Sequence, residues 1–171
     1  MTKKYILDSN IYIDFYDRYY AVGYFPSFWS EVPNFLNDQV VIPKVVLDEH
    51  YQDPWFRNWI TNNYKNQLID ERLYTNEWQQ ILGYLTQSPL YKDVAVTDPK
   101  QGWANSFIAD GWIIAIALRN EYTIVTDELR DPKLRTTQTG TKNAKIPDIC
   151  DHFGVNCINR NDFFNAIGLK V

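Results

Sequence analysis

Four acidic residues that are far apart in the sequence have the residue type and the surroundings to bind a divalent cation. Each follows or lies within an apolar segment, where a carboxylate is costly unless a cation or hydrogen-bond donors compensate its charge. Carboxylate oxygens are hard ligands that suit Mg²⁺ or Mn²⁺, and these ions can activate water and neutralise charge on a phosphate. The candidate ligands are Asp8, Glu49, Asp110 and Glu128.

Two of these acids come directly after short apolar segments. Asp8 follows residues 5–7, and Asp127 and Glu128 follow the β-branched segment 122–126. We expect both segments to be strands. In a parallel sheet the loops after the strands gather along one edge, so the acids should meet there. An Asp in such a position also commonly caps the next helix.

The other two acids belong to predicted helices. Asp110 opens a stretch that is apolar nearly all round and ends at Arg119, which predicts a deeply buried helix. Asp110 either contributes to the cation site or caps this helix. Glu49 follows Asp48 at the end of an apolar turn, and side chains of adjacent helical residues point about 100° apart. Only one of that pair can face the site, and a lone helical Glu is more often solvated.

Short apolar strands alternate with helices along the chain. Strands are predicted at 5–7, 40–42, 122–126 and 155–158, and helices at 43–49, 54–87, about 106–119, 147–153 and 161–167, with helical parts between residues 26 and 36. In segment 54–87 the candidate core positions are Trp55, Trp59, Leu68, Leu73, Trp78, Ile81 and Leu85. Residues 129–145 are polar and predicted as a loop. This order predicts an α/β fold with a mainly parallel sheet covered on both faces.

Length and composition limit the class of protein. The 171 residues suit a single domain, 1–171, with a helical, aromatic-rich segment at about 54–87. A net charge of −4 argues against binding nucleic acid through a broad basic surface. No apolar run approaches the length of a membrane span, and the N-terminus lacks the features of a signal peptide. Cys150 and Cys157 do not form a CxxC motif, so we expect reduced thiols in a cytoplasmic protein.

The acids lie in motifs that resemble those of the PIN-domain superfamily. Residues 5–10 resemble its first motif, in which hydrophobic residues precede Asp-Thr/Ser-Asn, and residues 45–49 resemble its second. Residues 110–117 resemble the third, an Asp leading an Ile/Ala-rich helix, and residues 124–128 the fourth, with an acid two residues after the Thr. Segment 145–155 is similar to a narrower bacterial family of PIN-like proteins. The resemblance covers nearly the whole chain.

This resemblance implies a Rossmann-like three-layer sandwich and the metal-dependent hydrolysis of RNA by a ribonuclease that uses Mg²⁺ or Mn²⁺. The four acids would be both the metal ligands and the catalytic residues. Many bacterial relatives are toxins of toxin–antitoxin pairs, which implies an antitoxin partner and a homodimer. Residues expected to orient ligands or water around the ion are Ser9, Asn10, Thr126 and Asp127. Lys142 and Lys145 are candidates for contact with RNA phosphates, although surface lysines are mostly just solvated.

Other functions fit these residues less well. A haloacid-dehalogenase-type phosphatase needs an acid two residues after the first Asp, where Asn10 cannot donate a catalytic proton. A response-regulator receiver would need an acid pair beside the first strand and a Lys after a late strand. A zinc site at Cys150, His152 and Cys157 lacks an evident fourth ligand.

His50 is a packing residue or a general base. The main alternative is a catalytically silent PIN-like binding module.

Overall fold

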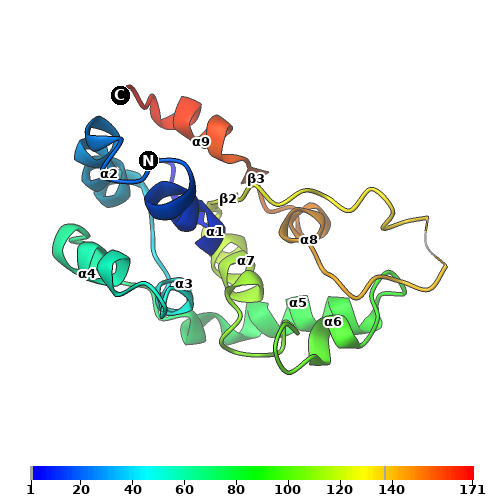
Figure 1. The fold of residues 1–171 in the computed structure, drawn as a ribbon. Coiled ribbons are helices and arrows are strands. Elements are labelled where there is room, and N and C mark those ends of the chain that lie inside the picture. The colour runs from blue at the N-terminus through cyan, green and yellow to red at the C-terminus, as the bar shows by residue number, and fades with distance from the viewer. Residues whose placement is uncertain (1, 137) are drawn as a thin grey trace.

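A computed structural model describes residues 2–136 and 138–171. Short strands and helices follow one another along the chain, as Figure 1 shows. Their bounds are β1 Tyr5–Leu7, α1 Ser9–Ile13, a π-helical turn Asp14–Arg18, α2 Pro26–Gln39, α3 Lys44–Glu49, α4 Pro54–Asn63, a 3₁₀ turn Glu71–Tyr74, α5 Thr75–Gln87, α6 Val94–Thr97, α7 Ala109–Asn120, β2 Thr123–Val125, α8 Ile146–Phe153, β3 Cys157–Ile158 and α9 Arg160–Ile167.

The named strands of the described residues form a three-stranded parallel sheet in the order β1-β2-β3. In its register Ile6 lies opposite Ile124, and Ile124 lies opposite Cys157. Every residue of β1 and β2 is buried, because helices cover both faces of a parallel sheet. The chain is thus a mixed α/β protein, as the alternation of strands and helices predicted.

The predicted strand at 40–42 is wrong in its extent. Val40 makes a single parallel bridge to Tyr5, and the Val41 amide donates to the Tyr5 carbonyl at 2.9 Å. Pro43 follows as the N-cap of α3, so the chain turns into a helix before a longer ladder can form. The last strand is also shorter than predicted, since β3 covers only Cys157–Ile158.

Helix α7 lies at the centre of the molecule, beside β2. Its residues from Gly111 to Ala117 are buried, which confirms the expectation drawn from its all-round apolar sequence. Against α7 pack α5 and α8. The contact with α5 includes a stack of the Trp78 and Trp112 rings, whose centroids are 4.2 Å apart. Part of the aromatic-rich segment therefore supports the helix that carries Asp110.

The predicted continuous helix from residue 54 to 87 is interrupted. Residue Ile69 pairs with the extended chain near Pro43: its amide donates to the Ile42 carbonyl, and its carbonyl accepts from the Lys44 amide. This tertiary pairing overrides the helical pattern between α4 and the 3₁₀ turn. Ile81 and Leu85 are buried as predicted, whereas Trp55 and Leu73 are exposed, so these two were wrong core candidates.

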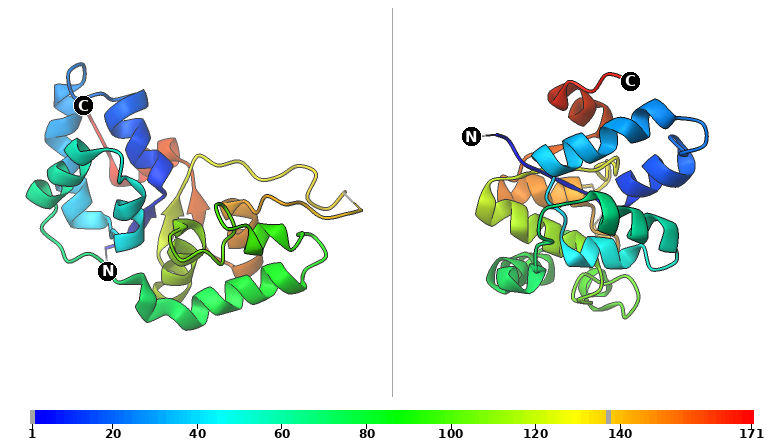
Figure 2. Two further views of the ribbon diagram at one scale, coloured as in Figure 1. Left: turned by 60° about the horizontal axis from the view of Figure 1, so that its bottom comes forward. Right: turned by 90° about the vertical axis from the view of Figure 1, so that its left-hand side faces the viewer.

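The helices lie on two sides of the strands. Figure 2 shows α1, α2, α3 and α4, in blue to cyan, on one side, and α5, α6 and the segments 129–136 and 138–145 on the other. The sequence pattern did not predict the π-helical turn Asp14–Arg18 or the short helix α6. Within residues 2–136 and 138–171, no helix combines the length and apolar character needed to cross a membrane.

Candidate metal centre

The carboxyl-end edge of the sheet brings together the four acids that the sequence singled out. Asp8 directly follows β1, and Glu128 lies three residues after the end of β2. Glu49 is the last residue of α3, and Asp110 is the second residue of α7. The pKa of Asp110 is raised by burial and, in decreasing order, by the charges of the other three, so all four share one electrostatic environment.

Asp8 is buried at the end of β1, with 4% of its surface exposed. It occupies the N-cap position of α1 but makes no side-chain capping bond there. Its Oδ2 instead accepts a hydrogen bond of 2.9 Å from the Thr126 hydroxyl, which joins the ends of β1 and β2. Burial raises the pKa of Asp8 to about 6, an effect that the Thr126 hydroxyl opposes and that Glu49 and Glu128 add to.

Asp110 and Glu49 meet at the N-terminus of α7. The N-cap residue is Ile108, and it is the Glu49 Oε1 that accepts from the Ala109 amide, at 2.8 Å. Asp110 is therefore not the capping residue that its position also allowed. Burial is the main cause of its pKa lying well above the usual range, and Lys145 is the nearby charge that opposes this shift.

The outer two acids are held by hydrogen-bond donors. Glu49 also accepts from the Ser9 hydroxyl through Oε2, and burial raises its pKa. Glu128 accepts from the Lys145 ammonium at 2.9 Å and from the Ile146 amide at 2.7 Å. With these side-chain directions, the described residues contain no group of three or more His, Cys, Asp or Glu side chains that could hold a metal ion.

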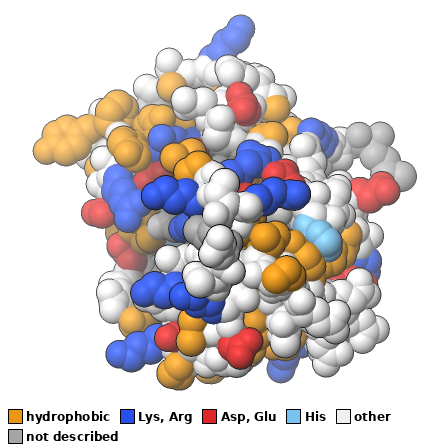
Figure 3. Space-filling model, turned by 90° about the vertical axis from the view of Figure 1, so that its right-hand side faces the viewer, with side chains coloured by type: hydrophobic (Ala, Val, Ile, Leu, Met, Phe, Trp, Pro, Cys, Tyr) orange, Lys and Arg blue, Asp and Glu red, His pale blue; other side chains and the backbone are white. Residues whose placement is uncertain are grey.

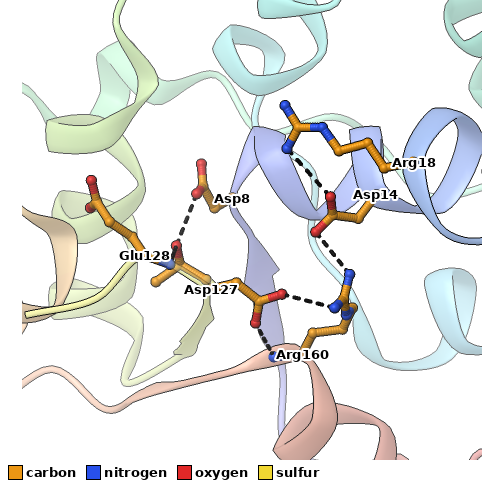
Figure 4. Close-up of polar contacts among 7 residues, drawn as sticks. Asp8, Asp14, Arg18, Asp127, Glu128 and Arg160 are labelled. Carbon is orange, nitrogen blue, oxygen red and sulfur yellow. Dashed lines mark hydrogen bonds and ion pairs between the residues drawn. The ribbon is translucent and has the colours of Figure 1, made fainter.

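The residues expected to orient ligands or water differ in where they point. Ser9 and Thr126 contact the acids directly, whereas Asn10 is exposed on α1. Asp127 turns away from Glu128 toward Arg160, as Figure 4 shows. Sequence reasoning missed Arg160, although it comes just after β3 and hence at the same edge of the sheet.

Three hollows surround the acids. Glu49 lines a groove of about 940 Å³, and Thr126 and Glu128 line another of about 740 Å³. Asp110 lines a smaller cavity of about 290 Å³ together with Lys142 and Lys145. Asp8 is buried, and the other three acids are half-buried and line different hollows rather than the bottom of one pocket.

Two histidines and two cysteines are further candidates for chemistry, and of these Cys157 lines the same groove as Thr126 and Glu128. His50, although next to Glu49, is buried against Tyr12 and Phe56, and burial lowers its pKa to about 4. His50 is therefore a packing residue. His152 stacks on Tyr84 with ring centroids 3.6 Å apart. Cys150 and Cys157 are free thiols.

Fold and site together define an α/β protein with neighbouring buried and half-buried acids at the carboxyl-end edge of a parallel sheet. The chain belongs to the family described as "Domain of unknown function (DUF4411)", whose model matches residues 5–171. No curated protein and no solved structure matches the chain.

Proposed function

We propose that this chain is a metal-dependent ribonuclease with a PIN-like fold, in which Asp8, Glu49, Asp110 and Glu128 hold Mg²⁺ or Mn²⁺. The observation that carries the proposal is that the charges of Asp8, Glu49 and Glu128, which come from three other segments, all act on the carboxyl group of Asp110. Burying several like charges destabilises a fold unless something compensates, and such clusters are typical of functional sites.

The donor set fits a hard divalent cation. All four candidate ligands are carboxylates, and burial makes Asp8 and Asp110 hard to ionise without a nearby positive charge. The donors that now hold Glu49 and Glu128 are a hydroxyl, two amides and Lys145. A divalent cation would compete with these donors for the outer carboxylates, because none of the donors carries more than a single positive charge.

The surrounding residues have distinct tasks in the proposed site. A bound Mg²⁺ or Mn²⁺ would supply an activated water and neutralise charge on the scissile phosphate. Asp8 and Asp110 would bind the cation, Thr126 fixes the rotamer of Asp8, and Ser9 fixes that of Glu49. Lys145 lines the same cavity as Asp110, where its ammonium group would balance the negative charge of the phosphodiester.

A local basic segment supports RNA as the substrate of an otherwise acidic protein. Residues 129–145 contain five basic residues and one acidic residue, a local charge of +4 against −4 for the chain. The basic residues are Arg130, Lys133, Arg135, Lys142 and Lys145. Figure 3 shows the face on this side of the molecule, where Lys and Arg side chains recur across the surface. Such a segment attracts a polyanion toward the cavity that Asp110 lines.

An RNA-cleavage assay with Mg²⁺ or Mn²⁺ tests the proposal. Wild type should cleave, and Asp8→Asn and Asp110→Asn should lose at least about 100-fold in rate with the circular dichroism spectrum retained. Asp38→Asn is the matched control, because Asp38 is exposed at the end of α2. Full activity of both site variants, or of wild type in chelator, would reject this mechanism.

The second candidate function is a catalytically silent PIN-like binding module. The ion pair of Glu128 with Lys145 favours it, because this acid already has a cationic partner. Two measurements together distinguish the two functions. A wild type that binds no Mn²⁺ in titration calorimetry and cleaves no RNA in a broad panel would support the binding module.

A further inference from the structure

Arg160 joins the chain segments that follow β1 and β2. It is the first residue of α9, just after β3. Its Nη1 donates to Asp14 Oδ2 at 2.8 Å, and its Nη2 lies 3.4 Å from Asp127 Oδ2. The Arg160 amide also donates to Asp127 Oδ1 at 2.9 Å. Figure 4 shows the guanidinium between the two carboxylates, with Asp8 and Glu128 beyond them.

The Asp14–Arg160 ion pair of this cluster is shielded from solvent, whereas the side chain of Asp127 is 35% exposed. The side chain of Arg160 is 15% exposed and that of Asp14 is 7% exposed. The guanidinium also lies over the Tyr19 ring, 4.5 Å from its centroid. Charges in such surroundings attract each other more strongly than surface charges do, and the planar guanidinium fixes the direction of each contact.

The two partners of Arg160 are close in sequence to the proposed ligands. Asp14 begins the π-helical turn that follows α1, and α1 itself begins right after Asp8. Asp127 lies between Thr126, which donates to Asp8, and Glu128. Arg160, just after β3, therefore links the end of α1 to the segment that follows β2.

We propose that Arg160 is a positioning residue, which sets the spacing of Asp8 and Glu128 for a divalent cation. The inference rests on the proposed function, since it assigns Arg160 a role toward the same metal site. Arg160 acts through the backbone on either side of the acids and does not touch the cation. Residues that support metal ligands in this way typically change metal affinity about 10–100-fold when they are replaced.

The variants Arg160→Met and Arg160→Lys test this role. Met keeps the apolar length and removes both ion pairs, whereas Lys keeps the charge but lacks the planar fork that serves two carboxylates. Arg18→Met is the matched control, because Arg18 contacts Asp14 Oδ1 at 3.4 Å and its side chain is 52% exposed. Ile60→Ala is a second control, which lowers stability by truncating a buried side chain of α4.

Mn²⁺ affinity is measured by titration calorimetry on the full chain, at a temperature where every variant is folded. We expect Arg160→Met to bind at least about 10-fold more weakly and Arg160→Lys to be intermediate. Arg18→Met and Ile60→Ala should stay within about threefold of wild type, whatever their melting temperatures. If Arg160→Met does not fold, Arg160→Lys decides the question alone.

Three outcomes would overturn the inference, and they differ in what else they reject. Arg160 variants that bind Mn²⁺ as tightly as wild type reject the positioning role and leave the proposed function intact. So does an affinity loss in Ile60→Ala equal to that in Arg160→Met, because the effect would then follow stability alone. A wild type that binds no Mn²⁺ rejects the proposed function together with this inference.

Discussion

The Thr126 hydroxyl at the end of β2 donates a 2.9 Å hydrogen bond to Oδ2 of Asp8 at the end of β1. The Thr126 hydroxyl oxygen in turn accepts a hydrogen bond from the Glu128 amide at 3.1 Å. One side chain thus connects two of the proposed ligands, which lie 120 positions apart in the sequence.

Replacing Thr126 with Val should weaken metal binding. Val has nearly the same shape but no hydroxyl, so Asp8 loses the donor that favours its ionised form. We expect Mn²⁺ affinity in titration calorimetry to fall about 10-fold. Thr123→Val is the matched control, since Thr123 is equally buried in β2 but contacts Asn156. Equal affinity of the two variants would show that the Thr126 hydroxyl does not support the site.

The metal-free protein should become more stable when Asp110 is replaced by Asn. Asn has a similar shape and carries no charge, so the cost of ionising a buried carboxyl near three acids disappears. A gain of about 0.5–2 kcal/mol is typical for relieving such a functional site, which corresponds to about 1–8 °C in Tm. Saturating Mn²⁺ should then raise the Tm of wild type more than that of the variant. Thermal unfolding in chelator that shows a lower Tm for Asp110→Asn would contradict the cost assigned to this carboxyl.

Mn²⁺ binding should depend steeply on pH. The cation binds the carboxylate form, and the pKa of Asp8 is raised from 3.8 to about 6. Protons therefore compete with the metal below about pH 6, and affinity should fall at least about 10-fold between pH 7 and pH 5. Asp110 adds to this trend because its pKa is raised as well. An affinity that stays constant over this range in calorimetric titrations would mean that neither acid is a ligand.

The two lysines of the Asp110 cavity should have different effects. Lys142→Gln should weaken RNA binding in chelator about 2–5-fold and leave Mn²⁺ affinity unchanged, because its charge acts on phosphate alone. Lys145→Gln should also tighten Mn²⁺ binding, since it removes an ammonium that pairs with Glu128 and lies near Asp110. Lys65→Gln, at an exposed position after α4, is the control. Fluorescence anisotropy measures RNA binding, and two indistinguishable site variants would refute the separate roles.

The sequence by itself determined the parts of the fold that local physics controls. The apolar segment before Asp8 and the β-branched segment before Asp127 became buried parallel strands, and the all-round apolar stretch after Asp110 became the central helix α7. Gly154 and Gly168 end α8 and α9 with positive φ, as expected for a residue without a Cβ. These features depend on residues that are close in the sequence, so they can be predicted from a single sequence.

Only the tertiary structure decided which groups contact each other. Ile69 left the predicted helix because the extended chain near Pro43 supplied its hydrogen bonds. Glu49, rather than Asp110, capped α7, since α3 packs against that helix. The ion pairs of Arg160 join residues up to 146 positions apart, so they could not be predicted from the pattern of neighbouring residues in the sequence. Contacts between distant residues and the burial of charged groups depend on how the whole chain packs. Packing decides which side chains are removed from water and which partners they then meet.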